Sequence, residues 1–248
     1  MRRREKQLAA LSAVLAVALC AGPSARAMHI MEGYLPPVYC VIWGAVCLPF
    51  LAAGVRSIRR TARERRKAML LLAMAGAFVF VISSLKIPSV TGSCSHMTGT
   101  GLAAILFGVP ATAVLGLIVL VFQAILLAHG GLTTLGANTF SMAIAGPLVS
   151  WSLYRGGRRL GLPQKLNVFL AAALGDLLTY CVTSVQLALA YPSESGGVPV
   201  SLVKFLGVFA PTQLPLAIIE GLLTMLVVMG METYALPELR LIGFAEEG

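Results

Sequence analysis

Long apolar runs dominate this sequence, and each of its main basic clusters borders one of them. Of its residues, 58% are hydrophobic and only 12% are charged, about half the charged share of an average soluble domain. Inside a lipid bilayer every backbone polar group must be satisfied within the protein, so runs of this kind fold as helices packed together. The sequence therefore predicts an all-α, polytopic integral membrane protein, a helical bundle surrounded by membrane lipid.

The positive charge of the chain indicates how these helices are oriented. The formal net charge of +9 comes largely from clusters at residues 2–6, 56–67 and 155–165. Lys and Arg next to apolar runs are typical of cytoplasmic loops. This placement favours a role in membrane orientation over nucleic-acid binding, and we expect no nucleic-acid partner.

Residues 1–27 have the three parts of a secretory signal peptide. A basic start precedes an apolar stretch at residues 8–21 and the small-x-small exit Ala25-Arg26-Ala27. The alternative is a retained first membrane helix, but the stretch is short for that and Gly22-Pro23 interrupts it. We therefore expect cleavage after Ala27, which leaves residues 28–248 as one transmembrane metal-binding domain with the Met28 terminus outside.

About seven membrane spans account for the apolar runs and for the basic clusters together. The clusters at 56–67 and 155–159 can both face the cytoplasm only if TGTGLAAILFGVP, residues 98–110, makes a short or broken crossing. Its glycines and Pro110 suit irregular backbone that neighbouring helices cover. The expected spans are residues 38–55, 68–85, 98–110, 111–128, 132–154, 166–190 and 213–233.

Motifs for ATP hydrolysis and for common hydrolases do not occur in the sequence. It contains no GxxxxGK[ST], no HExxH, no GxSxG and no suitable Ser/His/Asp set. The chain is therefore not expected to be an enzyme. An intramembrane enzyme is the alternative class, and the lack of an intramembrane nucleophile and base counts against it. The scattered cysteines do not predict a disulfide framework.

Cleavage after Ala27 would make a chelating group from Met28 and His29. The free amine of Met28, the peptide nitrogen of His29 and the Nδ1 atom of its imidazole can close adjoining rings around one ion. Nitrogens in one plane suit Ni(II), Cu(II) or planar Co(II) better than hard cations that prefer oxygen. Because binding needs a neutral imidazole and releases the amide proton, the affinity should rise with pH.

The natural fourth ligand is His96, in the loop GSCSHMTGTG after the second span. The alternative for His96 is a hydrogen bond to the loop backbone, the commoner role of a lone histidine. Cys94 is a competing ligand, although a thiolate would favour zinc or Cu(I). His129 is a further candidate, and the preferred interpretation for it is an interfacial cap at the end of a span.

Four other polar residues are candidates for supporting roles. Glu32 and Asn138 can orient the imidazoles as hydrogen-bond partners outside the ligand set. Asp176 and Glu220 are carboxylates within apolar runs, where ionisable groups are costly and commonly functional. For these two, pairing inside the bundle or with a partner subunit and a direct role in transport stand as equal alternatives.

Three stretches resemble the cobalt-transport membrane proteins of the CbiM family: MHIMEGYLPP, PSVTGSCSHMTGTGLAAILFG and HGGLTTLGANTFSMAIAGP. The resemblance covers most of residues 28–248. It implies a bundle of about seven helices whose amino-terminal segment enters the core, with Met28, His29 and His96 as metal ligands. The family usually has proline after the loop histidine, where this chain has Met97, a change that removes no ligand.

The resemblance also implies a function and partners. It points to the substrate-specific component of an energy-coupling-factor transporter in the inner (plasma) membrane, which takes up Co2+ for cobalamin synthesis. The implied partners are a pair of cytoplasmic ABC-type ATPase subunits, a transmembrane coupling (T) subunit and a small accessory membrane subunit. Uptake of Ni2+, as in the similar NikM proteins, is the close alternative, and a receptor that senses metal without transporting it is another.

Overall fold

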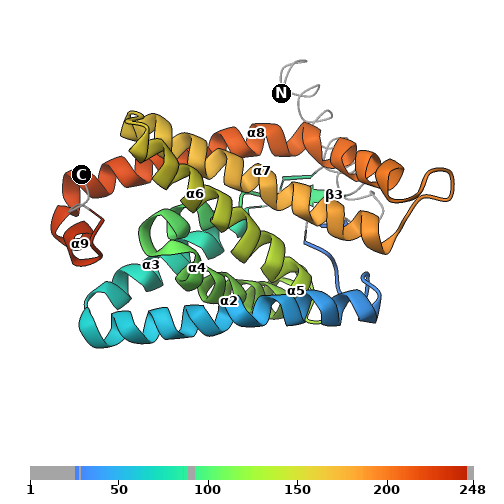
Figure 1. Cartoon of the computed structure of the whole chain (residues 1–248), viewed down its shortest axis with the longest axis horizontal. Helices are drawn as coiled ribbons and strands as arrows, with labels where there is room; N and C mark the ends of the chain where they lie inside the picture. The colour runs from blue at the N-terminus through green and yellow to red at the C-terminus, as the bar shows by residue number, and fades with distance from the viewer. Residues whose placement is uncertain (1–25, 28, 86, 89–92, 245–248) are drawn as a thin grey trace, which may run out of the picture.

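The computed structural model describes residues 26–27, 29–85, 87–88 and 93–244. It is a bundle of helices with a small three-stranded sheet near one end (Figure 1). The helices are α2 (Pro37–Glu64), α3 (Ala68–Ser84), α4 (Thr100–Leu127), α5 (Leu135–Asn138), the π-helix η2 (Thr139–Ala145), α6 (Gly146–Arg159), α7 (Gln164–Ala190), α8 (Gly197–Tyr234) and α9 (Leu236–Leu241), and the strands are β1 (Arg26–Ala27), β2 (Ile87–Pro88) and β3 (Ser93–Ser95).

The helices follow the expected membrane spans. By length and composition, α2, α4, α7 and α8 can each cross a membrane, and α3 is a shorter apolar helix. The elements α5, η2 and α6 form one continuous helical rod, because the residues at both junctions keep right-handed helical backbone angles. The predicted all-α, polytopic membrane bundle is therefore confirmed. One boundary was wrong: α8 begins at Gly197 rather than near Gln213, and continues through Pro211 and Pro215.

The third crossing is short, as the sequence predicts, because α4 bends sharply at Gly108. This residue has φ 79° and ψ 166°, backbone angles that only glycine adopts readily. A straight helix of 28 residues would separate its ends by about 42 Å. Yet the rings of His96, just before α4, and His129, just after it, have centroids only 5.0 Å apart. Within α4, therefore, the chain runs toward one end of the bundle and back.

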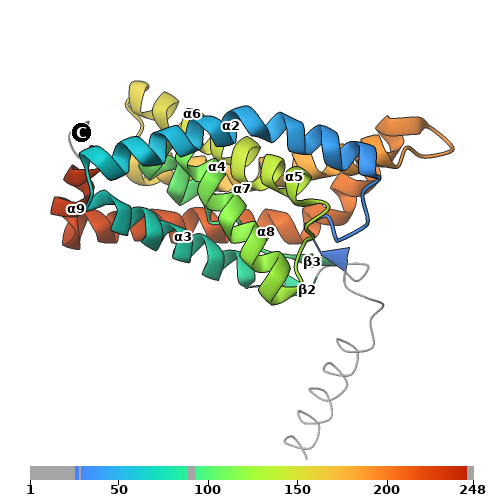
Figure 2. The ribbon, with the colours of Figure 1, turned by 90° about the horizontal axis from the view of Figure 1, so that it is seen from below.

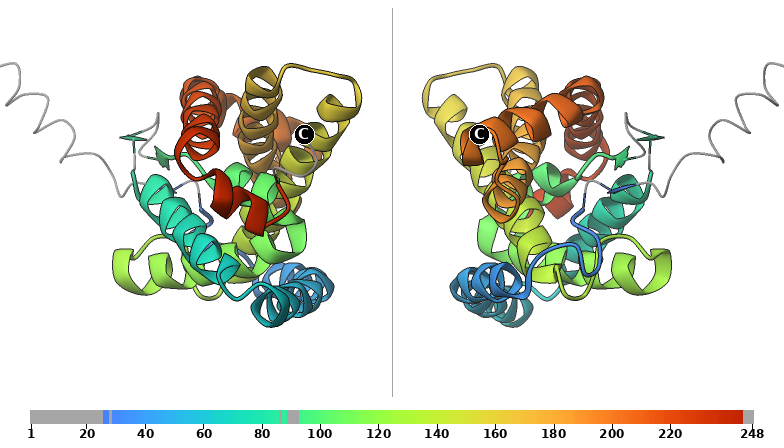
Figure 3. Two further views of the ribbon diagram at one scale, coloured as in Figure 1. Left: turned by 90° about the vertical axis from the view of Figure 1, so that its left-hand side faces the viewer. Right: turned by 90° about the vertical axis from the view of Figure 1, so that its right-hand side faces the viewer.

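The two ends of the bundle differ in chemistry. At one end, which we call the basic end, α2 and α6 finish in arginine-rich turns, and Arg65 donates a hydrogen bond to the carbonyl of Leu241 at 3.1 Å. The short helix α9 lies across this end (Figure 3). At the other, the histidine end, strands β2 and β3 lie opposite α9 (Figure 2). Between the histidine end and the basic end the chain runs along both arms of α4 and then along the α5–η2–α6 rod, an arrangement that fits the odd number of crossings expected from the sequence.

Small residues allow the elements near the histidine end to approach closely. A Cβ atom added at Gly136 would lie 2.6 Å from the backbone of Gly44, so α5 and α2 touch backbone to backbone. Likewise, a Cβ at Gly116 of α4 would lie 2.5 Å from the Cβ of Ala143 in η2. Contacts of this kind are typical of helix pairs in membranes. They fix the start of the α5–η2–α6 rod against α2 and α4.

In the unprocessed chain the small sheet places the segment before His29 beside the loop that carries His96, and β1 belongs to the part expected to be removed by cleavage after Ala27. Strand β3 lies in the middle, parallel to β1 and antiparallel to β2. The chain leaves β1 toward His29 and leaves β3 toward His96. Most of the expected signal peptide, residues 1–25, and Met28 lie outside the described residues.

Candidate metal centre

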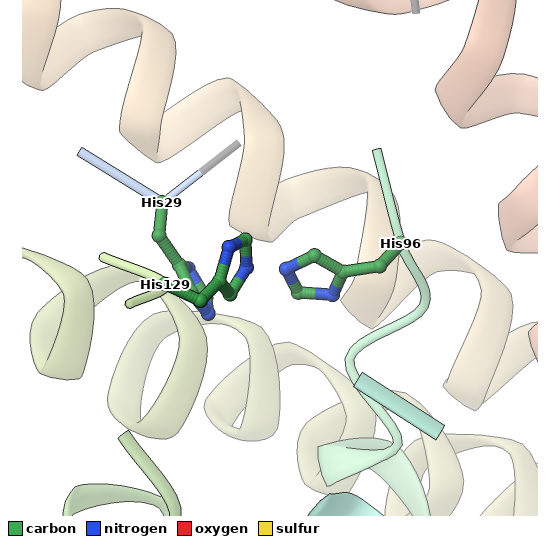
Figure 4. Close-up of side chains that lie close together, drawn as sticks. All are labelled: His29, His96 and His129. Carbon is green, nitrogen blue, oxygen red and sulfur yellow. The ribbon is translucent and has the colours of Figure 1, made fainter. Parts of the chain in front are cut away.

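Three histidines from distant parts of the sequence meet inside the histidine end (Figure 4). The centroid of the His29 ring lies 4.7 Å from that of His96 and 4.6 Å from that of His129. One ligand nitrogen from each ring lies within 4.8 Å of the other two. The residues are only 2%, 0% and 2% exposed. Buried imidazoles that converge in this way can hold a transition-metal ion.

A hydrogen bond to Gln123 favours one tautomer of His29. The Nε2 atom of His29 lies 3.2 Å from Oε1 of Gln123, whose amide nitrogen donates to the hydroxyl of Ser83 at 2.7 Å. Since that amide nitrogen is engaged, the amide oxygen faces His29 and accepts the Nε2 proton. Nδ1 is then the nitrogen of His29 with a lone pair for a metal. This is the atom that a ring with the His29 peptide nitrogen requires.

A backbone carbonyl fixes the protonation of His96. Its Nδ1 atom lies 2.8 Å from the carbonyl oxygen of Met97, which can only accept, so Nδ1 carries the proton. Nε2 therefore has the lone pair, and it faces the other two rings (Figure 4). The hydroxyl of Tyr180 donates to the backbone carbonyl of His96 itself. The backbone hydrogen bond considered as the alternative role of His96 is present, but it uses the nitrogen that faces away from the cluster.

His129 lies in the cluster and not at a solvent-facing cap. It is 2% exposed, and the chain turns inward because Ala128, which ends α4, has the left-handed φ of 47°. The preferred sequence interpretation, an interfacial cap, does not describe this position. Gln123 was missed altogether, although a glutamine within the apolar run 111–128 is the signal that could have identified it.

Asn138 holds the backbone next to His29. Its Oδ1 accepts a hydrogen bond from the amide of Ile30 at 2.9 Å, and its Nδ2 donates to the carbonyl of Ile30 at 3.0 Å. The hydroxyl of Thr134 donates to the same carbonyl at 2.6 Å. Asn138 therefore lies beside the site, but its expected role of orienting the imidazoles stays a prediction. It acts on the main chain and contacts no imidazole through these bonds.

Glu32 ties the amino-terminal segment to the loop after His129. Its carboxylate accepts hydrogen bonds from the amides of Leu132 at 2.5 Å and Thr133 at 3.2 Å, and its own amide donates to the carbonyl of Gly130 at 3.2 Å. Hydrogen bonding by Thr133 holds the pKa of this carboxyl below its usual range. This attachment is therefore present above the ordinary carboxyl pKa and is lost as the pH falls through the lowered value.

The remaining sequence candidates lie partly outside the described residues. Met28 is not described, and Cys94 is described only as backbone within β3. Asp176 on α7 and Glu220 on α8 are both 1% exposed. Glu220 accepts hydrogen bonds from the loop that follows His96, which favours pairing inside the bundle as its role.

A polytopic helical bundle that gathers three buried imidazoles at one end has the features expected of a membrane protein that binds transition-metal ions. Its relatives agree with this class. The chain belongs to the CbiM family, since residues 29–237 match the family described as cobalt uptake substrate-specific transmembrane region. It is therefore a membrane component of cobalt uptake and not an enzyme.

Individual relatives cover nearly the whole chain. The cobalt transport protein CbiM of Lachnoclostridium phytofermentans is 62% identical over 248 residues, which is 100% of this chain and 99% of the relative. The protein of the same name from Chlorobium limicola is 62% identical over 213 residues, 86% of this chain and 84% of the relative. Crystal structures of a transition metal transporter and of a truncated one each give a TM-score of 0.72, at 28% and 27% identity, and cover 83% of this chain and 92% and 99% of theirs.

Proposed function

We propose that this chain is the substrate-binding component of an ATP-driven Co2+ importer of the energy-coupling-factor type. The observation that carries the proposal is the burial of His29, His96 and His129 around one point. Four nitrogens would form a plane: the Met28 amine, the His29 peptide nitrogen, the His29 Nδ1 and the His96 Nε2. The hydrogen bonds of His29 to Gln123 and of His96 to Met97 support this set, because they leave these two imidazole nitrogens unprotonated.

His129 adds a nitrogen donor beside this plane. Its ring centroid is 4.6 Å from that of His29 and 5.0 Å from that of His96. An ion bound between those two rings therefore lies within reach of His129 after small side-chain rotations. A planar nitrogen set also suits Ni2+, so nickel uptake is the second candidate function. Affinity for Co2+ relative to Ni2+ distinguishes the two.

The energy for uptake must come from other subunits, because the sequence has no phosphate-binding loop. The family resemblance supports a pair of cytoplasmic ABC-type ATPase subunits, a transmembrane coupling (T) subunit and a small accessory subunit as partners, and cobalamin synthesis as the use of the metal. A metal sensor would need none of these subunits for its response.

The native protein, purified from membranes, should bind one Co2+ per chain and should have the intact mass of a chain that starts at Met28. Its affinity should rise with pH, since the His29 peptide nitrogen must lose its proton. Calorimetric titration at several pH values measures this, with Ni2+ as competitor. Cells that express the partner subunits should accumulate radiolabelled cobalt. A transporting chain that still carries residues 1–27 would contradict the chelate, and metal binding without partner-dependent uptake would indicate a sensor.

The histidine end should face the outside and the basic end the cytoplasm, in agreement with the preference of Lys and Arg for cytoplasmic loops. Single cysteines at Ser195, between α7 and α8, and at Arg159, at the end of α6, can be placed in a variant without native cysteines. A membrane-impermeant maleimide should label Ser195→Cys in intact cells and Arg159→Cys only after permeabilisation. The opposite pattern would show that the orientation is inverted.

A further inference from the structure

We infer that Glu220 is a positioning residue that holds the His96 loop, residues 96–99, in the geometry that metal binding requires. This inference rests on the proposed function. Glu220 lies on α8, is 1% exposed and is more than a hundred residues from the loop in sequence. It touches none of the proposed ligands through its hydrogen bonds, so its effect on the metal passes through the loop.

Glu220 receives three donors from two successive loop residues. Its Oε2 accepts from the amide of Thr98 at 2.6 Å, and its Oε1 accepts from the amide of Gly99 at 3.0 Å and from the hydroxyl of Thr98 at 2.9 Å. The hydroxyl of Thr100 donates in turn to that of Thr98 at 3.2 Å. Both carboxylate oxygens are therefore engaged by the loop. A single side chain on α8 thus ties two successive loop residues to this helix.

The loop needs an acceptor of this kind because of its conformation. Gly99 has the left-handed φ of 68°, so the chain leaves the helical pattern just before α4, and the amides of Thr98 and Gly99 both face Glu220. In an apolar surrounding, amides that leave the helical pattern must find partners. A carboxylate with two acceptor oxygens matches two successive N–H groups, whereas a neutral amide side chain offers one oxygen and presents an N–H group to the other donor.

The loop is fixed at both ends by these contacts. The hydroxyl of Tyr180, on α7, donates to the carbonyl of His96, and Glu220 on α8 holds Thr98 and Gly99. Between the two, the Nδ1 bond of His96 to the Met97 carbonyl sets the direction of the ring. Without Glu220, of these two contacts only the hydrogen bond from Tyr180 to His96 would hold this loop. The Met97 carbonyl could then move, and the His96 ring that donates to it would no longer direct its Nε2 atom toward His29.

The neighbouring carboxylate, Asp176, interacts with Glu220 and Thr98 but holds the loop less directly. Neither oxygen of Asp176 lies at ordinary hydrogen-bond distance from a donor in the described part of the chain. Thr224, on the same helix as Glu220 and also buried, has a hydroxyl without such a partner among those residues. Thr224→Val is therefore a matched control, since it removes a buried polar group from α8 and leaves the loop contacts intact.

The test is the affinity and the absorption spectrum of bound Co2+ in the processed protein. Glu220→Gln should weaken Co2+ binding by about 10- to 100-fold, the range typical of groups that orient metal ligands. It should also shift the visible ligand-field bands of the bound ion. Thr98→Val, which removes one donor to Glu220, should shift the bands in the same direction with a smaller loss of affinity. In the double variant the loss of binding free energy should be smaller than the sum of the losses in the two single variants.

The outcomes separate this inference from the function on which it rests. A wild-type protein that binds no Co2+ would overturn the proposed function. A wild-type protein that binds Co2+, together with a Glu220→Gln variant of equal affinity and identical spectrum, would overturn only the role of Glu220. If Glu220→Gln does not reach the membrane, Thr98→Val decides: an unchanged spectrum overturns the inference, and a shifted one supports it. Thr224→Val should match the wild type in both readouts.

Discussion

Replacing His29 by alanine should abolish Co2+ binding at concentrations that saturate the wild-type protein. The change removes Nδ1 and opens the ring that this atom would close with the peptide nitrogen. His96→Ala should have a comparable effect, because it removes the remaining nitrogen of the plane. Each loss should exceed the roughly 10- to 100-fold reduction typical of groups outside the ligand set. Calorimetric titration of the processed proteins measures the affinity, and cobalt uptake with the partner subunits measures the consequence.

Substitutions of His129 and of the surface residue Lys204 serve as comparisons for these two variants. His129→Ala should weaken binding less than the other two changes, because the four planar nitrogens stay in place. If His129 were only an interfacial cap, as the sequence suggested, its replacement would cause no loss of affinity. Lys204→Ala, at an exposed position of α8, should bind and transport like the wild type. A His29→Ala protein with wild-type affinity would show that this imidazole is not a ligand.

Inserting one alanine between Met28 and His29 should abolish cobalt transport while every side chain is kept. The residues after the insertion cannot shift, because Asn138 and Thr134 hold Ile30 and Gln123 holds His29. The extra residue must therefore displace Met28, by up to ~3.5 Å along the chain. Its amine can then no longer close a ring with the peptide nitrogen of His29.

The insertion also creates a different chelate, with histidine at the third position of the chain. There two peptide nitrogens, the amine and the imidazole complete a plane without His96, so the variant should still bind Cu(II) or Ni(II) at its terminus. Met28→Leu is the matched control: it keeps the backbone amine, changes only the side chain and should transport normally. The intact mass must show processing at the same bond in both variants. Wild-type uptake of radiolabelled cobalt by the insertion variant would mean that the spacing is unimportant and that the proposed chelate is wrong.

The helical architecture could be predicted from the sequence because lipid imposes simple constraints on it. Apolar length gave the spans, and the basic clusters required a short extra crossing where Gly108 now bends α4. The beginning of α8 at Gly197 could not be predicted. Pro211 and Pro215 lie inside this helix, and proline in a sequence ordinarily indicates a helix boundary.

The site was only partly predictable, for a geometric reason. The chemistry of a processed Met-His terminus is local, so His29 could be recognised from two residues. The position of His129 depends on the return of α4 from Gly108 and on the positive φ of Ala128, and neither has a signature in the residues around His129. The role of Gln123 depends on which face of α4 meets His29. From the sequence alone Asp176 and Glu220 could not be told apart, and only the hydrogen bonds of Glu220 to the loop after His96 distinguish their roles.

The near-complete burial of the three rings has a consequence for the timing of ion exchange. At 0–2% exposure, solvent cannot reach the site to take the place of a departing ligand. Exchange of a bound ion would require the segment 29–33 to lift away from the loop 130–134, and this would break the hydrogen bonds of Ile30 and Glu32 to that loop. Because this segment carries His29, the same opening would also break the bonds between this proposed ligand and the ion. The residence time of the cargo would then depend both on the hydrogen bonds that hold this segment and on the bonds between the ion and His29, so the protein would release its ion more slowly than an exposed site with the same ligands.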